Sequence, residues 1–274
     1  MDDINEDVRR LEEKAKVIRK YVINMIYQAG SGHVGGALSC TDILTMIYFF
    51  KMKHNPQDPK WENRDRFILS KGHAAPVLYA ILAECGYFPI EELNTLRKFG
   101  SRLQGHPNNN LPGIDVSSGS LGQGLSIASG MALSAKLDKK DFKIYVVLGD
   151  GECNEGQVWE AVMFASHYNL DNIIVIIDRN YFQIDGRTED IMSLEPLEDK
   201  FKAFNWNVYK CNGNDIRDLI TIFNNIQNKS NEKPTVIIAS TIKGKGVKFM
   251  ENDNSFHGRA PSITEYEKAI KELE

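Results

Sequence analysis

A short acidic motif, Gly149-Asp150-Gly151, is the first candidate for chemistry in this sequence. It directly follows a continuous apolar run, Ile144 to Leu148, of the kind that forms a buried parallel strand. Glycine on both sides of Asp150 lets the backbone turn tightly and lets a bulky anion approach the main chain. The helix expected to start near Asn154 would offer its N-terminal amides to phosphate oxygens. An ordinary surface turn is the alternative for the triplet taken alone.

A second polar motif, Asp178-Arg179-Asn180, follows the next apolar run, Ile173 to Ile177. In an open α/β sheet, ligands bind beyond the carboxyl ends of the strands, so both motifs are expected at one site. A carboxylate placed beside a diphosphate needs a cation between the two negative groups. Asp150, the amide oxygen of Asn180 and a backbone carbonyl just after it would supply hard oxygen ligands for magnesium or calcium.

Histidine is placed unusually in this chain, because four of its six imidazoles adjoin a glycine. An imidazole on such close-approach backbone suits hydrogen bonding or proton transfer to a small polar ligand. Each one alone could equally be a solvent-facing or core histidine, the interpretation that we keep for the other two. The spacing disfavours zinc, since no two histidines lie within five residues and no cysteine stands near them. The four histidines beside glycine are His33, His73, His106 and His257.

Two glycine-rich segments complete the candidate set. Gly119 to Gly124 precedes a helix of small residues, Leu125 to Ala132. It is not the dinucleotide-binding fingerprint, because no apolar strand leads into it and no acid follows at the expected distance. A tight turn feeding a closely packed helix is the alternative. Lys243-Gly244-Lys245-Gly246 follows the last expected strand, where a lysine could reach a phosphate or simply face solvent.

Length and composition are typical of an ordinary globular protein. The chain has 274 residues, of which 42% are hydrophobic and 26% charged, so it can bury a sizeable core as one domain. Its 33 basic and 37 acidic residues leave a net charge of −4, without a basic stripe for a nucleic-acid backbone. The apolar runs are far shorter than the roughly 20 residues that cross a membrane, and the four cysteines show no metal or disulfide spacing. We expect a cytoplasmic protein with reduced thiols that binds neither nucleic acid nor membrane.

The elements that must position these residues alternate between strand and helix. Strands are expected at Phe67 to Leu69, Ile144 to Leu148, Ile173 to Ile177 and Val236 to Ala239. Helices are expected at Val8 to Tyr27, Val158 to Tyr168, Asp215 to Asn228 and Ile263 to Leu273, and another from a capping box of Ser39 and Asp42 through Tyr48. Asp185 to Ala203 is expected to form a loop with a short helix. The alternation predicts a doubly wound α/β fold with a mostly parallel sheet flanked by helices.

Taken together, these segments resemble the N-terminal, diphosphate-binding half of a transketolase, a thiamine diphosphate-dependent enzyme. Gly149-Asp150-Gly151 followed by Asn180 resembles the family's thiamine diphosphate motif, and the resemblance extends over nearly the whole chain. Further matching segments occur in the family's order: Ser31-Gly32-His33, Ser70-Lys71-Gly72-His73, Gly105-His106-Pro107, Gly119 to Gly124, Lys243 to Gly246 and Phe256-His257-Gly258.

The resemblance implies a role for each matching position. Asp150, Asn180 and the backbone carbonyl of Phe182 match the ligands of a magnesium or calcium ion. The positions matching contacts to thiamine diphosphate are Gly36, His73, Gly119, Ser120, Leu121, Gly151, Asn180, Lys243 and His257. The imidazoles matching those around the reactive carbon, where they bind sugar hydroxyls and move protons, are His33, His73, His106 and His257. Glu155 resembles the glutamate that links the two active sites across the family's dimer interface.

The resemblance also implies an activity and a partner. Transketolases reversibly transfer a two-carbon glycolaldehyde unit from a ketose phosphate to an aldose phosphate, using thiamine diphosphate and a divalent metal. Single-chain members carry the glutamate that activates the aminopyrimidine on a second domain, and this chain stops before that domain would begin. We therefore expect residues 1–274 to form one diphosphate-binding domain, with the pyrimidine-binding and C-terminal domains on a separate C-terminal subunit. Two chains of each kind would form a heterotetramer, and this chain alone would bind cofactor poorly and catalyse nothing.

Other functions fit the sequence less well. A component of another thiamine diphosphate enzyme is one, whether transketolase-like on an unusual sugar phosphate, deoxyxylulose phosphate synthase-like or 2-oxoacid dehydrogenase-like. A non-catalytic, degenerate module would show damage among the ligand positions, which are intact. A nucleotide-binding domain is disfavoured by the missing dinucleotide fingerprint. One departure from the family is Val34, where many relatives have proline after the first histidine.

Overall fold

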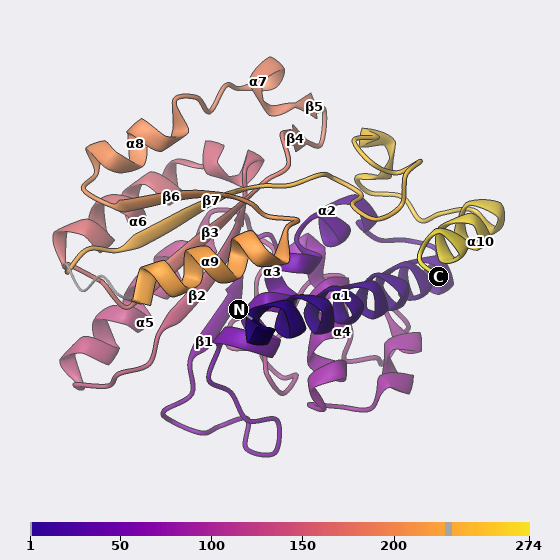
Figure 1. The fold of residues 1–274 in the computed structure, drawn as a ribbon, viewed down its shortest axis with the longest axis horizontal. Coiled ribbons are helices and arrows are strands. Elements are labelled where there is room, and N and C mark those ends of the chain that lie inside the picture. Colours follow the sequence, from indigo (N-terminus) through magenta and orange to yellow (C-terminus); the bar gives the residue numbers. More distant parts are fainter. Residues whose placement is uncertain (1, 228–231) are drawn as a thin grey trace.

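A parallel sheet forms the centre of the molecule (Figure 1). The computed structural model describes residues 2–227 and 232–274. The five strands are all parallel, in the order β1 (Arg66–Leu69), β2 (Ile144–Gly149), β3 (Ile173–Arg179), β7 (Thr235–Ser240) and β6 (Asn207–Asn212). A small antiparallel pair, β4 (Phe182–Gln183) and β5 (Gly186–Arg187), follows β3. β2 and β3 are buried along their whole length, as their continuous apolar sequences predict.

Helices cover both faces of the sheet, which confirms the doubly wound α/β architecture. One face carries α1 (Asp2–Ala29), α2 (Val34–Ser39), α3 (Thr41–Met46) with a π-helical turn η1 (Ile47–Lys51), α4 (Ala75–Cys85) and α9 (Ile216–Gln227). The other carries α5 (Gln123–Leu137), α6 (Gly156–His167) and α8 (Leu197–Ala203). Shorter elements are η2 (Gly72–Ala74), η3 (Ile90–Thr95), η4 (Gly151–Asn154), α7 (Thr188–Ile191) and η5 (Asn254–Phe256). The last helix, α10 (Ile263–Glu272), lies beside the end of α1 (Figure 1).

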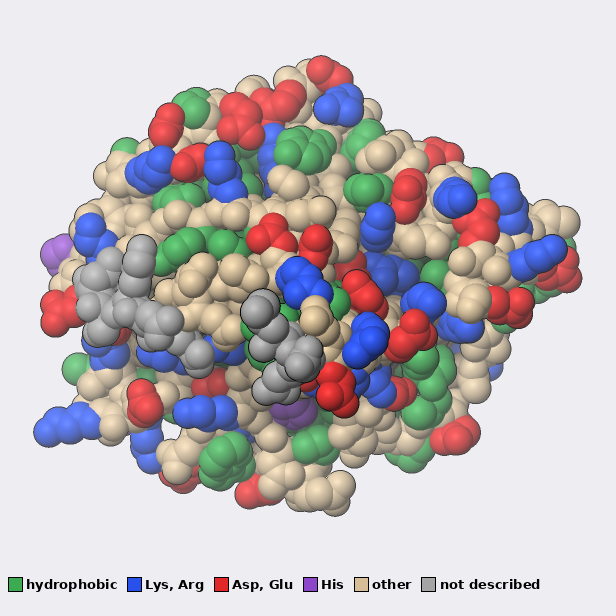
Figure 2. All heavy atoms as spheres, viewed as in Figure 1, with side chains coloured by type: hydrophobic (Ala, Val, Ile, Leu, Met, Phe, Trp, Pro, Cys, Tyr) green, Lys and Arg blue, Asp and Glu red, His purple; other side chains and the backbone are tan. Residues whose placement is uncertain are grey.

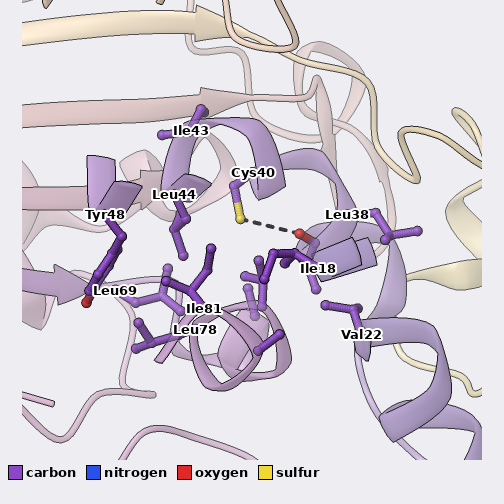
Figure 3. Close-up of a cluster of buried hydrophobic side chains, with 14 of the residues drawn as sticks. Ile18, Val22, Leu38, Cys40, Ile43, Leu44, Tyr48, Leu69, Leu78 and Ile81 are labelled. Atoms are coloured by element: carbon purple, nitrogen blue, oxygen red, sulfur yellow. Dashed lines mark hydrogen bonds between the residues drawn. The ribbon is translucent and has the colours of Figure 1, made fainter. Parts of the chain in front are cut away.

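Alternate residues of each strand enter two separate hydrophobic cores. Tyr145 and Val147 of β2 pack toward α1, α3 and α4, whereas Val146 and Leu148 pack toward α5 and α6. Figure 3 shows part of the first core, where side chains of α1, α3, α4 and β1 interdigitate. Ile18 at its centre is fully buried. The two cores hold the sheet rigid, so the loops at its carboxyl edge are carried on a fixed base.

The predicted elements are mostly confirmed. The helices expected from Val8 and Val158 begin six and two residues before their predicted starts, and the helix expected from Ile263 begins at that residue. The helix expected from Asp215 is α9, and its predicted last residue, Asn228, lies outside the described residues. Several elements had no prediction, among them the helix α4 and the strand β6. The residues of β6 are mostly polar and only partly buried.

The capping box predicted for Ser39 and Asp42 is wrong. α2 ends at Ser39, and α3 begins at Thr41 with Cys40 as its N-cap. The Ser39 hydroxyl instead donates to the Asp178 carboxylate at 2.6 Å. Asp42 forms a buried ion pair with Arg19, also at 2.6 Å. Distant charged partners therefore outweigh the local capping pattern.

The surface shows no single dominant charge on the face in Figure 2, where acidic and basic side chains are interspersed. None of the helices in residues 2–227 and 232–274 is long and apolar enough to cross a membrane.

Candidate cofactor-binding and active site

A cleft of about 830 Å³ lies at the carboxyl edge of the sheet, beyond the ends of β1, β2, β3 and β7. It brings together all the residues for which the resemblance implies a role except Ser120, which is exposed outside the lining. The predicted residues that line it are His33, Gly36, His73, His106, Gly119, Leu121, Asp150, Gly151, Glu155, Asn180, Phe182, Lys243 and His257. Residues separated by more than 200 positions in sequence thus share one site.

Three of the glycine-adjacent histidines form a compact cluster. The ring centroids of His33, His73 and His257 lie 5.1 to 5.7 Å apart. His106 packs on Gly119, where an added Cβ would come within 2.9 Å of the imidazole Cδ2 and the backbone φ is +145°. Only glycine satisfies both conditions at position 119, so the glycine fixes where His106 can lie.

The clustered imidazoles are neutral at neutral pH. Burial, followed by nearby positive charge, lowers the pKa of His33 to about 4 and that of His257 to about 3. A neutral imidazole can accept a proton or a hydrogen bond from a sugar hydroxyl, which an imidazolium cannot. The Nδ1 atom of His33 is buried and has no hydrogen-bond partner within the part of the chain that the structure describes. Such an atom is costly unless a ligand satisfies it.

Asp150 and Asn180 form an acidic wall of the same cleft, at the ends of β2 and β3. The fully buried Asp150 carboxylate accepts hydrogen bonds from the backbone N–H groups of Gly151 at 2.8 Å and Tyr181 at 2.6 Å. Burial and the neighbouring Asp178 carboxylate raise the pKa of Asp150 to about 6. The Asn180 side-chain oxygen accepts from the N–H of Phe182 at 3.1 Å. A divalent cation would offset the cost of burying Asp150, so this set of oxygen donors fits magnesium or calcium.

Lys243 is a buried cation suited to an anionic ligand. Its side chain is 1% exposed, and it forms no ion pair with any residue in the ranges 2–227 and 232–274. The ammonium donates to Asn254 at 2.6 Å and lies 2.7 Å from Nδ1 of His257. Burial and the positive charge of Lys71 lower the pKa of Lys243 to about 8. A diphosphate placed between Lys243 and the Gly151 turn would supply the missing negative charge.

Several residues of the site were missed from the sequence. Lys71, inside a matched segment, is buried and donates to Asp178 and to the Gly36 carbonyl, the latter at 2.9 Å. Glu152 accepts from Ser70 and from the N–H of Gly122 at 2.9 Å, which fastens the Gly119 to Gly124 turn to the end of β2. Each is a charged residue shortly after a buried strand, and that position is the signal that could have identified it.

Arg179 connects the acidic wall to the segment after β5. It is 1% exposed, and its guanidinium pairs with Asp150 at 3.2 Å and with Glu189 at 2.6 Å. A further contact reaches Glu195 at 3.1 Å. The loop expected over Asp185 to Ala203 is therefore tied to the cleft by ion pairs, and its residues Met192 to Leu194 complete the cleft wall.

The fold and this cleft define a thiamine diphosphate-binding domain. Residues 11–273 match the family model described as the transketolase thiamine diphosphate binding domain. The chain is 46% identical to one subunit of the apulose-4-phosphate transketolase of Phocaeicola vulgatus, over 97% of this chain and 94% of that protein. It is 45% identical to the 6-deoxy-6-sulfo-D-fructose transketolase subunit SqwG of Clostridium sp. strain MSTE9, over 96% of both. The chain belongs to the transketolase family, which confirms the resemblance found in the sequence.

A solved structure gives the same result for the fold. The transketolase from Campylobacter jejuni superposes with a TM-score of 0.92 at 33% identity. The match covers 97% of this chain but 43% of that one, so the chain spans less than half the length of the solved transketolase. It spans nearly the full length of the two relatives named as subunits.

Proposed function

We propose that this chain is the diphosphate-binding subunit of a two-chain transketolase. With its partner it would transfer a two-carbon glycolaldehyde unit from a ketose phosphate to an aldose phosphate. The observation that carries the proposal is the cleft itself, which is lined by both the cluster of His33, His73 and His257 and the acidic wall of Asp150 and Asn180. The near-complete match to relatives named as subunits supports a separate partner.

Each wall of the cleft would hold one part of thiamine diphosphate. Asp150, Asn180 and the carbonyl of Phe182 would bind Mg²⁺ or Ca²⁺, and Lys243 and Gly151 would contact the diphosphate. Further cofactor contacts would come from Gly36, His73, Gly119, Ser120, Leu121 and His257. When bound, the cofactor supplies a carbanion and an electron sink for carbon–carbon bond cleavage. The chain's own contribution is position, charge and proton transfer.

The histidines would handle the sugar. The pKa of His33, His106 and His257 is lowered in each case, and burial is the largest cause. The three rings are therefore neutral at pH 7. They would accept hydrogen bonds from the sugar hydroxyls next to the carbon–carbon bond that is cleaved. They would also take up a hydroxyl proton during cleavage and return it during addition. Burial and the charge of Lys71 lower the pKa of His73 well below its usual range, so it would stay neutral beside the cofactor.

The partner would complete the site. We propose a C-terminal subunit that carries the activating glutamate, in a heterotetramer of two plus two chains with Glu155 near the contact between two copies of this chain. Glu155 lines the cleft and is exposed, as such a position requires.

A second class of sugar substrate is also a candidate. The relatives are named for apulose-4-phosphate and for 6-deoxy-6-sulfo-D-fructose. Their names favour an unusual anionic ketose as an alternative to the ordinary pentose and hexose phosphates.

A reconstitution assay tests this proposal. The chain is assayed with thiamine diphosphate and Mg²⁺, alone and mixed with a candidate C-terminal transketolase subunit. Xylulose 5-phosphate with ribose 5-phosphate is the first substrate pair, followed by apulose 4-phosphate and 6-deoxy-6-sulfofructose. We expect turnover only in the mixture. A mixture containing His257→Ala controls for contaminating transketolase. Full activity of the chain alone, or a mixture that binds cofactor and turns over no ketose, would overturn the proposal.

The charge of Lys243 should make anion binding depend on pH. Its pKa of about 8 means that the free chain loses this positive charge as the pH rises from 7 to 9. A bound diphosphate stabilises the charged lysine and raises its pKa, so affinity should fall by up to about tenfold per pH unit above 8. Calorimetry with magnesium pyrophosphate at pH 7, 8 and 9 measures this fall. Lys243→Arg stays charged and should lose less affinity over the same range, which separates the lysine from ionisation of pyrophosphate. Equal slopes in the two proteins would contradict the assignment.

A further inference from the structure

Arg97, outside the residues assigned so far, has a strained backbone. Its φ is +59°, in the left-handed region that costs a residue with a side chain about 1–2 kcal/mol. The surrounding loop imposes this conformation, because the N–H of Arg97 donates to the Leu103 carbonyl at 2.8 Å. The hydroxyls of Thr95 and Ser101 bond to each other across the loop at 2.7 Å. The direction of the Arg97 side chain is therefore fixed by a rigid loop.

The guanidinium of Arg97 joins the two loops that carry His33 and His106. Its Nη1 donates to the Ser31 hydroxyl at 3.3 Å, two residues before His33. Its other face covers Gly105, immediately before His106, where an added Cβ would lie 2.9 Å from Nη2. A glycine at position 105 leaves the room that the guanidinium occupies.

Arg97 also carries a charge that no acid balances. Among the residues that the structure describes, it has no ion-pair partner, whereas Arg102 of the same loop pairs with Glu92 at 2.7 Å. After burial, the charge of Arg97 is the first cause that lowers the pKa of both His33 and His106. The other titratable groups near these two imidazoles are Lys71, His73, Lys243 and His257, and the Tyr79 hydroxyl donates to the backbone carbonyl of His106 at 2.9 Å.

We propose that Arg97 is a positioning residue for the histidine cluster. It fixes the His33 and His106 loops against each other and places a permanent positive charge beside both imidazoles. Because that charge disfavours imidazolium, the two rings stay ready to accept protons from a polar ligand. The proposal concerns the chain's own histidines, so it stands or falls independently of which sugar the enzyme uses.

Histidine titration in the full chain tests the proposal without any activity. The imidazole pKa values are measured by NMR in the wild type, Arg97→Met, Arg97→Lys and Lys98→Met. We expect Arg97→Met to raise the pKa of His33 and His106 by about one pH unit, the effect of one charge several ångströms away at a part-buried site. Arg97→Lys keeps the charge and should keep both values low. Lys98→Met removes an exposed neighbouring charge and should leave both within about 0.2 pH unit.

A second variant distinguishes the effect of the Arg97 charge from unfolding of the loop. Gly105→Ala keeps the charge but fills the space under the guanidinium, so it should displace the guanidinium and raise the pKa of His106. In the reconstituted enzyme, the acidic limb of kcat/KM should move to higher pH in Arg97→Met, whereas a purely structural loss would lower the whole profile without moving it. Unchanged pKa values in Arg97→Met, or an equal rise in Lys98→Met, would overturn the proposal.

Discussion

Asp150→Asn is expected to abolish metal-dependent binding of thiamine diphosphate, with a loss of at least about 100-fold in affinity. Loss of an outer-shell partner alone costs a metal site about 10–100-fold, and Asp150 would be the one charged protein ligand of the ion. The substitution keeps the shape of the side chain and removes its negative charge. An amide would also have to place an NH₂ group against the donors of Gly151, Tyr181 or Arg179, all of which now face carboxylate oxygens.

The fold should survive this change. Burial raises the pKa of Asp150 to about 6, which means that the ionised carboxylate is already unfavourable in the folded chain at pH 7. A neutral side chain removes that cost, which offsets the poorer fit of the amide to its donors, so thermal unfolding should change little. The low stability of the ionised group without a ligand is typical of a site retained for binding.

Calorimetry with thiamine diphosphate and Mg²⁺, on the chain mixed with its C-terminal partner, measures the effect of Asp150→Asn. Asp185→Asn is a matched control, because it makes the same change at an exposed carboxylate next to Ile184 of the cleft wall. The control should bind with wild-type affinity. Wild-type binding by Asp150→Asn would remove Asp150 from the metal ligands.

The buried strands could be predicted because their environment is uniform. Every residue of β2 and β3 is buried between two layers of helices, so their sequences are apolar without interruption. β6 could not be predicted, since it lies at the edge of the sheet and only Cys211 among its residues is buried. Its sequence is polar like that of a loop, and only its pairing with β7 makes it a strand.

The site could be predicted where position along the chain indicates a role. Asp150 and Asn180 follow buried strands, and the four histidines are marked by their glycines. The sequence does not indicate the role of a residue whose partner lies far away along the chain. Lys71 and Asp178 are 107 residues apart, and neither sequence neighbourhood indicates the other. The mistaken capping box has the same cause, since Ser39 bonds to this same Asp178 rather than to its own helix.

The Lys71–Asp178 pair leads to the largest expected effect on stability. The two side chains are 1% and 0% exposed, and Lys71→Met would leave the Asp178 carboxylate buried without its cation. Removing one partner of such a pair costs about 3–5 kcal/mol, equivalent here to a fall in Tm of about 10 °C. Burial alone would lower the pKa of Lys71, but the Asp178 carboxylate outweighs it and raises that pKa. Titration of the lysine therefore takes nothing from the pair's contribution below about pH 10, the pKa of an unfolded lysine, and removes it only at higher pH.

Urea unfolding at pH 7 compares Lys71→Met with two further proteins. Lys136→Met breaks an exposed pair with Asp171 at 2.6 Å and should cost less than about 1 kcal/mol. In Lys71→Met with Asp178→Asn, no charge is left unpaired. Ser39 and Thr241 donate to different oxygens of Asp178, so the asparagine oxygen can accept from one hydroxyl while its NH₂ group donates to the other. The double variant should therefore be more stable than Lys71→Met, although it has lost more of the native pair. If Lys71→Met were no worse than Lys136→Met, the pair would not be what holds the ends of β1 and β3 together under the cleft.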